Sequence, residues 1–120
     1  MSSILRDTKE FSNLSDDNKS FDTVIIMYIN GCLAYLNQMG VGPKIIYQIV
    51  NYNEEWSNFS DDMFIQTTAR TYITAKTKLQ FDPPITVAHL EALKETISES
   101  EWRLQSYIIA PPSLDDAVLI

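Results

Sequence analysis

The fold is decided by residues 23–43, TVIIMYINGCLAYLNQMGVGP, which predict one long helix and its end. Apolar side chains in this stretch occupy more than one stripe of a helical projection, which is typical of a helix that packs on two sides. Ser20 is the expected N-cap, and Asp22 places a negative charge near the free amides of the first turn. Gly40 suits the left-handed residue that closes a helix, and Gly42-Pro43 prevents continuation. We therefore expect a buried helix.

Two further helices are predicted downstream of it. The first has Ser60 as its expected N-cap and aspartates 61–62 in its opening turn. It ends at residues 82–84, DPP, because a residue that precedes proline is pushed out of the helical region. The second begins at Thr86 and ends at the proline pair 111–112. Its inward face is expected to consist of Leu90, Leu93, Ile97, Leu104 and Ile108.

The segments around these helices are predicted to be extended or weakly attached. Residues 1–19 alternate short apolar spots with charges and serines, so we expect an N-terminal arm, either mobile or folded into a short, weakly docked helix. Residues 44–59 are rich in β-branched and aromatic side chains, which favour an extended or hairpin-like excursion. The alternative is a short helix that opens at Pro43. Trp56 and Phe59 are expected to pin the excursion onto the helices.

Length and composition set the class of the protein. The chain has 120 residues, of which 45% are apolar and 21% charged, and this is sized for one small domain. We expect a mainly α fold: a small bundle of three to four helices over residues 20–110, with the excursion, and an extended C-terminal tail at residues 111–120. A net charge of −7 disfavours free-standing nucleic-acid binding, because an acidic surface repels phosphates.

No segment of the sequence resembles a membrane anchor or a targeting signal. The longest apolar stretch, residues 24–36, is interrupted by Asn30 and Gly31. A bilayer span needs roughly 20 predominantly apolar residues. The N-terminal residues are polar and lack the apolar core of a signal peptide. We therefore expect the protein in a reducing, aqueous compartment.

The sequence offers few groups for catalysis or metal binding. His89 is the only histidine and is expected at the surface, which excludes a histidine-based triad or a multi-histidine metal site within one chain. Cys32, the only cysteine, lies among apolar residues and is expected to be an inert core thiol. Adjacent aspartates point in different directions on a helix, and no phosphate-binding glycine loop is present. We predict that the protein is not an enzyme and has no catalytic residue, metal or cofactor.

The last predicted helix carries a charge within its apolar stripe. Glu101 falls inside this stripe, where an isolated carboxylate is unfavourable. Arg70 or Lys76 of the preceding helix is therefore its expected ion-pair partner. Glu99 and Arg103 are spaced for an i,i+4 ion pair on the helix surface.

The same helix is predicted to carry a second apolar surface. Trp102 and Ile109 fall together on a side well away from the inward stripe. Two interpretations stay open for Trp102. It covers the excursion at Trp56 and Phe59, or it meets another subunit, because tryptophan is favoured at interface centres.

The C-terminal tail is too apolar for a purely solvated segment. Such a tail can dock on its own domain or cross to a neighbour. Its apolar residues are Leu114, Ala117, Val118, Leu119 and Ile120.

Several short blocks occur along the chain in a recognisable order. They are LNQMGVGP at residues 36–43, WSNF at residues 56–59, TYITAKTKLQFDPP at residues 71–84, LKE at residues 93–95 and EWRL at residues 101–104. The series resembles small tailed-bacteriophage proteins of the head–tail connector type, also called adaptor or head-completion proteins. The resemblance covers most of the chain.

The resemblance implies a non-enzymatic structural subunit of the virion neck, made in the host cytoplasm. Such subunits assemble as a ring, typically twelvefold, beneath the portal, where they extend the channel for genome packaging and ejection and dock tail, tail-terminator or stopper proteins. Carried over, residues 113–120 are the portal-facing tail, and residues 44–59 contact a neighbour or the next ring. DNA is expected to pass an acidic lumen without specific binding. The alternative is a small soluble helical regulatory protein that binds a host or phage partner.

Overall fold

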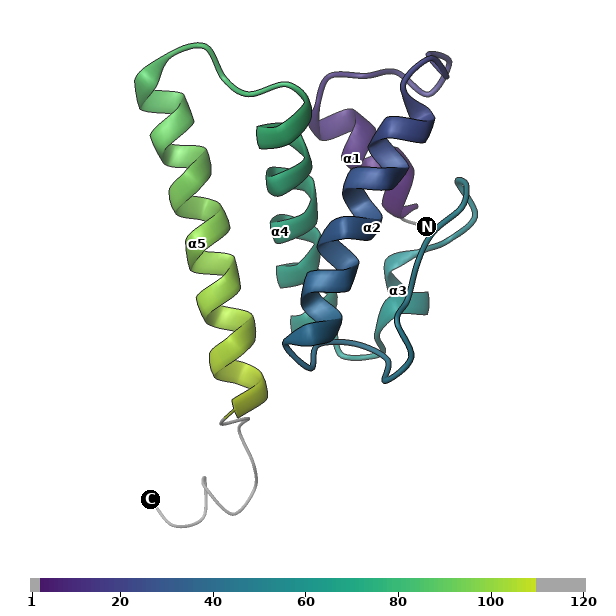
Figure 1. Cartoon of the computed structure of the whole chain (residues 1–120), viewed down its shortest axis with the longest axis vertical. Helices are drawn as coiled ribbons and strands as arrows, with labels where there is room; N and C mark the ends of the chain where they lie inside the picture. Colours follow the sequence, from purple (N-terminus) through teal and green to yellow (C-terminus); the bar gives the residue numbers. More distant parts are fainter. Residues whose placement is uncertain (1–2, 110–120) are drawn as a thin grey trace.

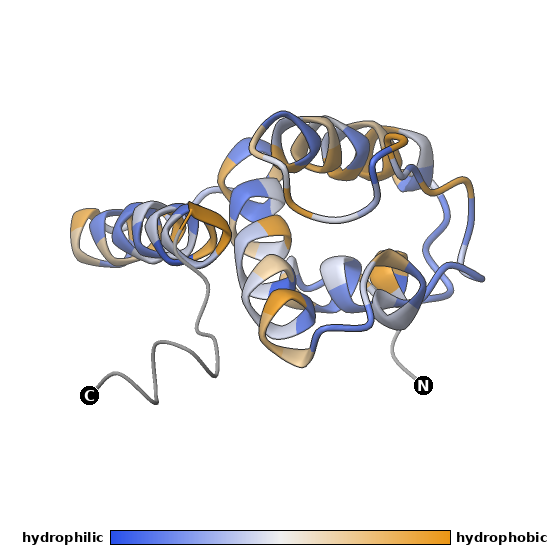
Figure 2. Cartoon of the chain, turned by 90° about the horizontal axis from the view of Figure 1, so that it is seen from below, coloured by the Kyte–Doolittle hydropathy of each residue, from blue (hydrophilic) through white to orange (hydrophobic). Residues whose placement is uncertain are grey.

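The protein is built around one central helix, α4, with the other helices packed on its two sides. The computed structural model describes residues 3–109. Within this range the helices are α1 (Ile4–Phe11), α2 (Asp22–Gln38), α3 (Trp56–Phe59), α4 (Met63–Phe81) and α5 (Val87–Ile109). Helices α1, α2 and α3 contact α4 on one side, and α5 packs against it on the other (Figures 1 and 2). The predicted mainly α fold is confirmed, and within the described residues the only bridge between extended segments joins Ser3 and Glu55.

The predicted long, buried helix is α2, and it begins one residue later than the expected cap implies. Its N-cap is Phe21, without a side-chain hydrogen bond, so the prediction of Ser20 as the cap is wrong. Asp22 does lie in the first turn, but its carboxylate binds side chains from other segments. Gly40 has the predicted left-handed backbone, with a φ of +85°.

The cap of α4 also differs from the prediction. Asp62 is the N-cap, and its carboxylate accepts hydrogen bonds from the amides of Phe64 (2.8 Å) and Ile65 (3.3 Å). Ser60 ends α3 instead, and its hydroxyl accepts the Asp62 amide at 3.1 Å. The prediction was wrong because the excursion ends in a helix of four residues, α3, and Ser60 is the C-cap of that helix.

The N-terminal segment is part of the core, so the prediction of a mobile arm or weakly docked helix for residues 1–19 is wrong. Ile4 and Leu5 of α1 are fully buried, and α1 contacts both α2 and α4. The Ser3 hydroxyl caps the helix by accepting the Arg6 amide, and the Ile4 amide donates to the Glu54 carbonyl at 3.0 Å. A helix of eight residues is marginal by itself in water. Tertiary packing, which no local pattern reveals, stabilises it here.

The main polar link within the described residues is centred on Lys9. This side chain is 0% exposed, and its ammonium donates to the carboxylate of Asp22 (2.7 Å), the carbonyl of Asn18 (2.7 Å) and the hydroxyl of Tyr52 (2.6 Å). The Tyr52 hydroxyl in turn donates to the other Asp22 oxygen at 2.9 Å. We call Lys9, Asp22 and Tyr52 the lysine cluster. It joins α1, the first turn of α2 and the excursion at one point.

The pKa values of the cluster reflect this pairing. Burial acts against both charged forms, but hydrogen bonds to Asp22 and Tyr52 outweigh it and raise the pKa of Lys9. Burial is likewise outweighed for Asp22, whose pKa is lowered by the hydrogen bonds from Lys9 and Tyr52. Folding therefore favours the ionised form of each partner.

The excursion is extended but is not a hairpin within the described residues. Asn30 of α2 holds its backbone, because its side-chain oxygen accepts the Ile49 amide (2.8 Å) and its side-chain NH₂ donates to the Ile49 carbonyl (3.0 Å). Trp56 and Phe59 are both buried and pin the end of the excursion against α4, as predicted. Gly42 is needed where the chain turns, because a Cβ there would lie 2.6 Å from the Phe59 ring.

Helix α5 lies to one side of the bundle. Most of its predicted inward stripe is confirmed: Leu93, Ile97 and Leu104 are buried against α4, and Ile108 is partly buried against the core. Leu90, near the start of the helix, is only half-buried and is not part of the core. Near its C-terminal end, the Tyr107 hydroxyl donates to the Asp62 carboxylate at 2.6 Å, which ties the end of α5 to the start of α4. Helix α5 makes no comparable contact with α1, α2 or α3. One whole side of α5 therefore faces away from the bundle.

Replacing Lys9→Met tests the lysine cluster. Methionine keeps an aliphatic side chain of similar length but leaves the Asp22 carboxylate without its cation. We expect a loss of on the order of 3 kcal/mol in the free energy of unfolding, measured by urea denaturation at pH 7. Arg6→Ala is the control, because it breaks the exposed Arg6–Asp16 pair (2.6 Å), and such pairs contribute less than about 1 kcal/mol. Equal losses for the two variants would contradict the role assigned to the cluster.

The pKa shifts predict where the cluster is lost as pH changes. The contribution of Asp22, whose pKa is lowered, is complete above the ordinary value of about 3.9 and disappears as pH falls through the lowered pKa. The contribution of Lys9, whose pKa is raised, is complete below about 10.4 and disappears as pH rises through the raised pKa. The difference in unfolding free energy between the unmodified chain and Asp22→Asn should therefore be constant near neutral pH and shrink towards both extremes. A difference that grows on acidification would be incompatible with the cluster.

Candidate functional site

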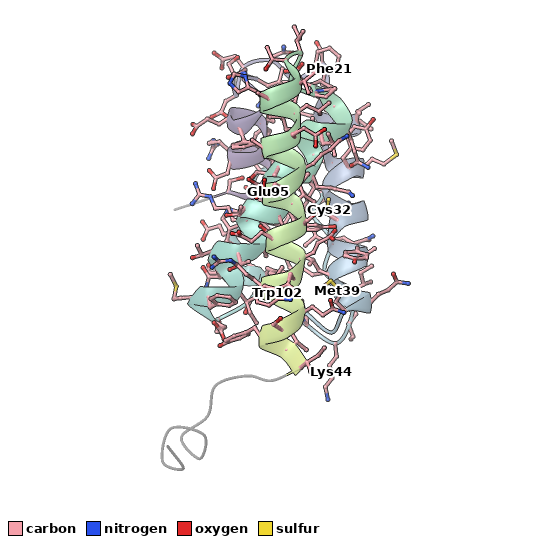
Figure 3. The ribbon with its side chains drawn as sticks, turned by 90° about the vertical axis from the view of Figure 1, so that its left-hand side faces the viewer. Phe21, Cys32, Met39, Lys44, Glu95 and Trp102 are labelled. Carbon is pink, nitrogen blue, oxygen red and sulfur yellow. The ribbon has the colours of Figure 1, made fainter. Side chains whose placement is uncertain are left out.

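The side of α5 that faces away from α4 is a helix surface without a partner among the described residues. Nine residues, or two and a half turns, separate Trp102 from the buried Leu93, which places them on opposite sides of the helix. Glu95 lies seven residues before Trp102 and on the same side, as Figure 3 shows. We call Glu91, Glu95, Trp102 and Ile109 the outer face of α5. Its N-terminal half is acidic and its C-terminal half is apolar.

Trp102 does not cover the excursion. Its side chain is 67% exposed, and Ile109 is 75% exposed on the same side of the helix. Trp56, which it was expected to cover, is 4% exposed and donates from its indole nitrogen to the Asp7 carboxylate at 2.8 Å. Phe59 is 3% exposed and packs with the Tyr47 ring. The structure excludes the interpretation that Trp102 covers the excursion, and residues 3–109 leave its side chain exposed.

Other exposed apolar side chains gather at the excursion. Ile45 is 83% exposed and Val50 is 72% exposed, and both belong to a segment without helix or strand. Figure 1 shows most of this segment on the side of α2 away from α5, whereas its two ends, at Pro43 and Phe59, line a hollow together with Ile108 of α5. Exposed apolar side chains are candidates for contact with a partner. The excursion is therefore a second candidate surface, distinct from the outer face of α5.

A third candidate is a groove between α2 and α5, floored by α4. It has a volume of about 320 Å³. We call it the α2–α5 groove, and its lining includes Met27, Tyr28, Tyr35, Tyr72, Lys76 and Glu101. It exists because α2 and α5 both pack on α4 and do not meet across it.

The charged residues of this groove differ from the predicted ion pair. Arg70 lies elsewhere, and its guanidinium is 3.4 Å from the Asp7 carboxylate. Lys76 and Glu101 line the same groove, yet no ion pair joins them in the part of the chain that the structure describes. Glu101 lies beside Tyr72, where burial and then the nearby negative groups raise the pKa of the phenol. The expected Arg70–Glu101 pair is not formed.

Cys32 lies on the floor of the groove and is inert, as predicted. Its side chain is 4% exposed, and burial raises the pKa of the thiol to about 11, with Lys76 acting in the opposite direction. The thiolate, which is the reactive form, is therefore scarce at neutral pH. His89 is exposed, as predicted, and the predicted ion pair of Glu99 and Arg103 is present at 3.2 Å.

The described residues contain no group of acidic, histidine or cysteine side chains arranged to hold a metal ion. In residues 3–109 no helix combines the length and the apolar character that a bilayer crossing requires. The apolar tail residues of the sequence, from Leu114 to Ile120, lie outside the described range. The candidate surfaces of the described chain are the outer face of α5, the excursion and the α2–α5 groove.

Comparison with known families gives these surfaces a context. Residues 4–108 match the family described as phage connector protein. The chain belongs to this family. The predicted resemblance is thereby confirmed, and the matched range includes α1, which the sequence alone left as an arm. No curated protein and no solved structure matches the chain.

Replacing Trp102→Ala separates a surface role in this connector from a core role. Because the side chain is largely exposed in the single chain, we expect a change of at most about 0.5 kcal/mol in the free energy of unfolding at low micromolar concentration. Leu104→Ala, a fully buried neighbour on the same helix, should lose about 2–5 kcal/mol. Urea denaturation followed by circular dichroism measures both. A loss for Trp102→Ala as large as that for Leu104→Ala would place Trp102 in the core.

Proposed function

We propose that this connector is a head–tail adaptor of the virion neck, a non-enzymatic structural protein that forms a ring, about twelvefold, beneath the portal. It extends the DNA channel and docks tail, tail-terminator or stopper proteins. The observation that supports the proposal most is the outer face of α5, which leaves Trp102 and Ile109 exposed in a chain of the phage connector family.

A ring needs two different patches on each subunit. A head-to-tail interface joins one patch to a different patch of the next copy, and rotation closes the circle. The outer face of α5 and the excursion are two different patches of this kind, and most of the excursion lies on the side of α2 away from α5 (Figure 1). Ile45 and Val50 are the exposed apolar residues of the second patch. Helix α5 has 23 residues and is about 35 Å long, so one face of it offers a contact along most of the subunit. The proposal pairs the outer face of α5 with the excursion of the neighbour.

The charge of the chain suits passage of DNA without binding. Sixteen acidic residues against nine basic ones give each subunit a net charge of −7. An acidic lumen repels the phosphate backbone and discourages adhesion.

The contact with the portal is proposed for residues 113–120. This segment is SLDDAVLI, apolar after its two aspartates. An apolar segment that leaves a folded domain is suited to insertion into a groove of a partner. Ring interface and portal contact are thereby assigned to different parts of the chain.

The composition of purified particles tests this function. We expect about twelve copies of the polypeptide per particle, measured by quantitative mass spectrometry against the portal protein, with the copies located at the neck by electron microscopy. A small regulatory protein, which is the alternative, would be absent from purified particles. Trp102→Ala should reduce incorporation at least about tenfold, because it removes the centre of the proposed interface. Gln105→Ala, another exposed position of α5, is the matched control and should be incorporated normally. Normal incorporation of Trp102→Ala would contradict the interface assignment.

A further inference from the structure

The α2–α5 groove has the shape and chemistry to hold a short segment of extended chain. We propose that in the free subunit it binds residues 113–120 of the same chain. This inference concerns the single chain in solution, so it does not depend on the ring. It gives residues 113–120 a second binding site, in addition to the portal contact that is proposed for the assembled particle.

The lining of the groove provides apolar contacts that the described chain leaves open. Met27 is 63% exposed and Tyr35 is 41% exposed, and both are on the wall formed by α2. The Tyr35 ring stacks on Tyr72 of α4, with 6.0 Å between ring centroids, and this pair closes the lower part of the floor. A volume of about 320 Å³ equals that of about ten water molecules at roughly 30 Å³ each. The groove therefore has room for a few aliphatic side chains.

The described chain ends below this groove, beside the C-terminal end of α2. A Cβ added to Gly40, just beyond the C-terminal end of α2, would lie 3.6 Å from the Cγ2 of Ile108, so α5 ends beside the end of α2. Glu101, on the groove wall, is eight residues before Ile109, which is about 12 Å along the helix. Residues 110–120 can span up to about 36 Å when extended. The prolines at 111 and 112 disfavour continuation of the helix, and the remaining chain is long enough to return along the groove.

The order of charges and apolar groups matches between the groove and the segment. From the lower mouth upwards the groove presents Tyr35, then Lys76, then Met27, since Lys76 lies one turn above the Tyr72 that stacks on Tyr35. The segment presents Leu114, then two aspartates at 115–116, then AVLI. Lys76 forms no ion pair among the described residues, so its ammonium is available to these aspartates.

One charge in the groove opposes this arrangement, and its position limits the effect. Glu101 is the only carboxylate of the lining, and it lies beside Tyr72 rather than beside Lys76. Tyr72 and Lys76 are one turn apart on α4. The two aspartates of the segment are therefore expected to lie nearer to the Lys76 ammonium than to the Glu101 carboxylate.

Docking in this groove has a consequence for assembly. The apolar segment is covered until a partner with a better site is present, and the exchange is governed by the difference between the two affinities. The portal, in the proposed function, is that partner. A subunit whose segment is docked exposes less apolar surface before it meets the portal.

A cysteine placed at the exposed Gly31 position reports on the groove directly. Gly31 lines the groove, and a Cβ there would meet nothing within 4 Å. In a Cys32→Ala chain that carries Gly31→Cys, alkylation by N-ethylmaleimide, followed by intact mass spectrometry at pH 8, therefore measures how often the groove is open. We expect the full chain to react on the order of tenfold more slowly than the full-length variant Val118→Ser/Leu119→Ser/Ile120→Ser. Asp61→Asn, a change at an exposed residue outside the groove, is the control and should react like the unmodified chain. Equal rates for the full chain and the serine variant would overturn the proposal.

Charge exchange tests the contact between Lys76 and the segment. In the chain with the Gly31→Cys reporter, Lys76→Glu and Asp115→Lys/Asp116→Lys should each lose the protection of the reporter thiol, and their combination should recover it. Because a change of charge at Lys76 also acts on a thiol in the groove, each variant is compared with its own serine-tail version, so that only the protection is scored. Lys94→Glu, an exposed cation of α5 outside the groove, should leave the protection unchanged. Absence of recovery in the combined variant would overturn the assigned contact.

Dependence on concentration distinguishes the same chain from a neighbour. Protection by the chain's own segment is constant between about 1 and 100 µM, because the contact is intramolecular. Protection that rises with concentration would assign the groove to the segment of a second copy and overturn the proposal as stated. Neither result changes the copy number in particles, so failure of this inference is distinguishable from failure of the adaptor function.

Discussion

The lysine cluster is the constraint on which the arrangement of the other segments depends. A fully buried ammonium is tolerated only when it is paired and hydrogen-bonded, and Lys9 meets this condition with one group from each of three segments. Through Asp22 the pairing holds α1 against the start of α2, and through Tyr52 it attaches the excursion to the same point. With these segments in place, α4 is covered on one side and only its other side is left for α5.

The position of α5 has direct consequences for function. A helix packed on a single neighbour buries one stripe and exposes the opposite one, whatever residues it carries. In this chain the opposite stripe carries Trp102 and Ile109, two large apolar side chains that are mostly exposed to solvent. The groove between α2 and α5 has the same origin, since both helices pack on α4 without meeting. Two candidate binding surfaces thus follow from one packing arrangement in this member of the phage connector family.

Much of the candidate site was readable from the spacing of residues in α5. Leu93 and Trp102 are two and a half turns apart, so their opposite positions follow from helical geometry alone. The ion-pair prediction for Glu101 failed because it depended on which face of α4 is turned towards α5, and the sequence does not show this. Arg70 lies on the face towards α1, where it pairs with Asp7. The groove gave no signal in the sequence, since its lining comes from three helices whose relative placement no local pattern contains.

The sequence by itself determined the three long helices, the glycine turn at Gly40 and the inert Cys32, because caps, prolines and periodic apolar residues act within a few positions of each other. The tertiary structure alone decided that residues 4–11 form a core helix, because eight residues lack the length to be helical without packing. It also decided that Lys9 is buried, since its partner Tyr52 lies 43 positions away. Long-range contacts of this kind depend on how helices pack, and helix packing is set by the whole chain.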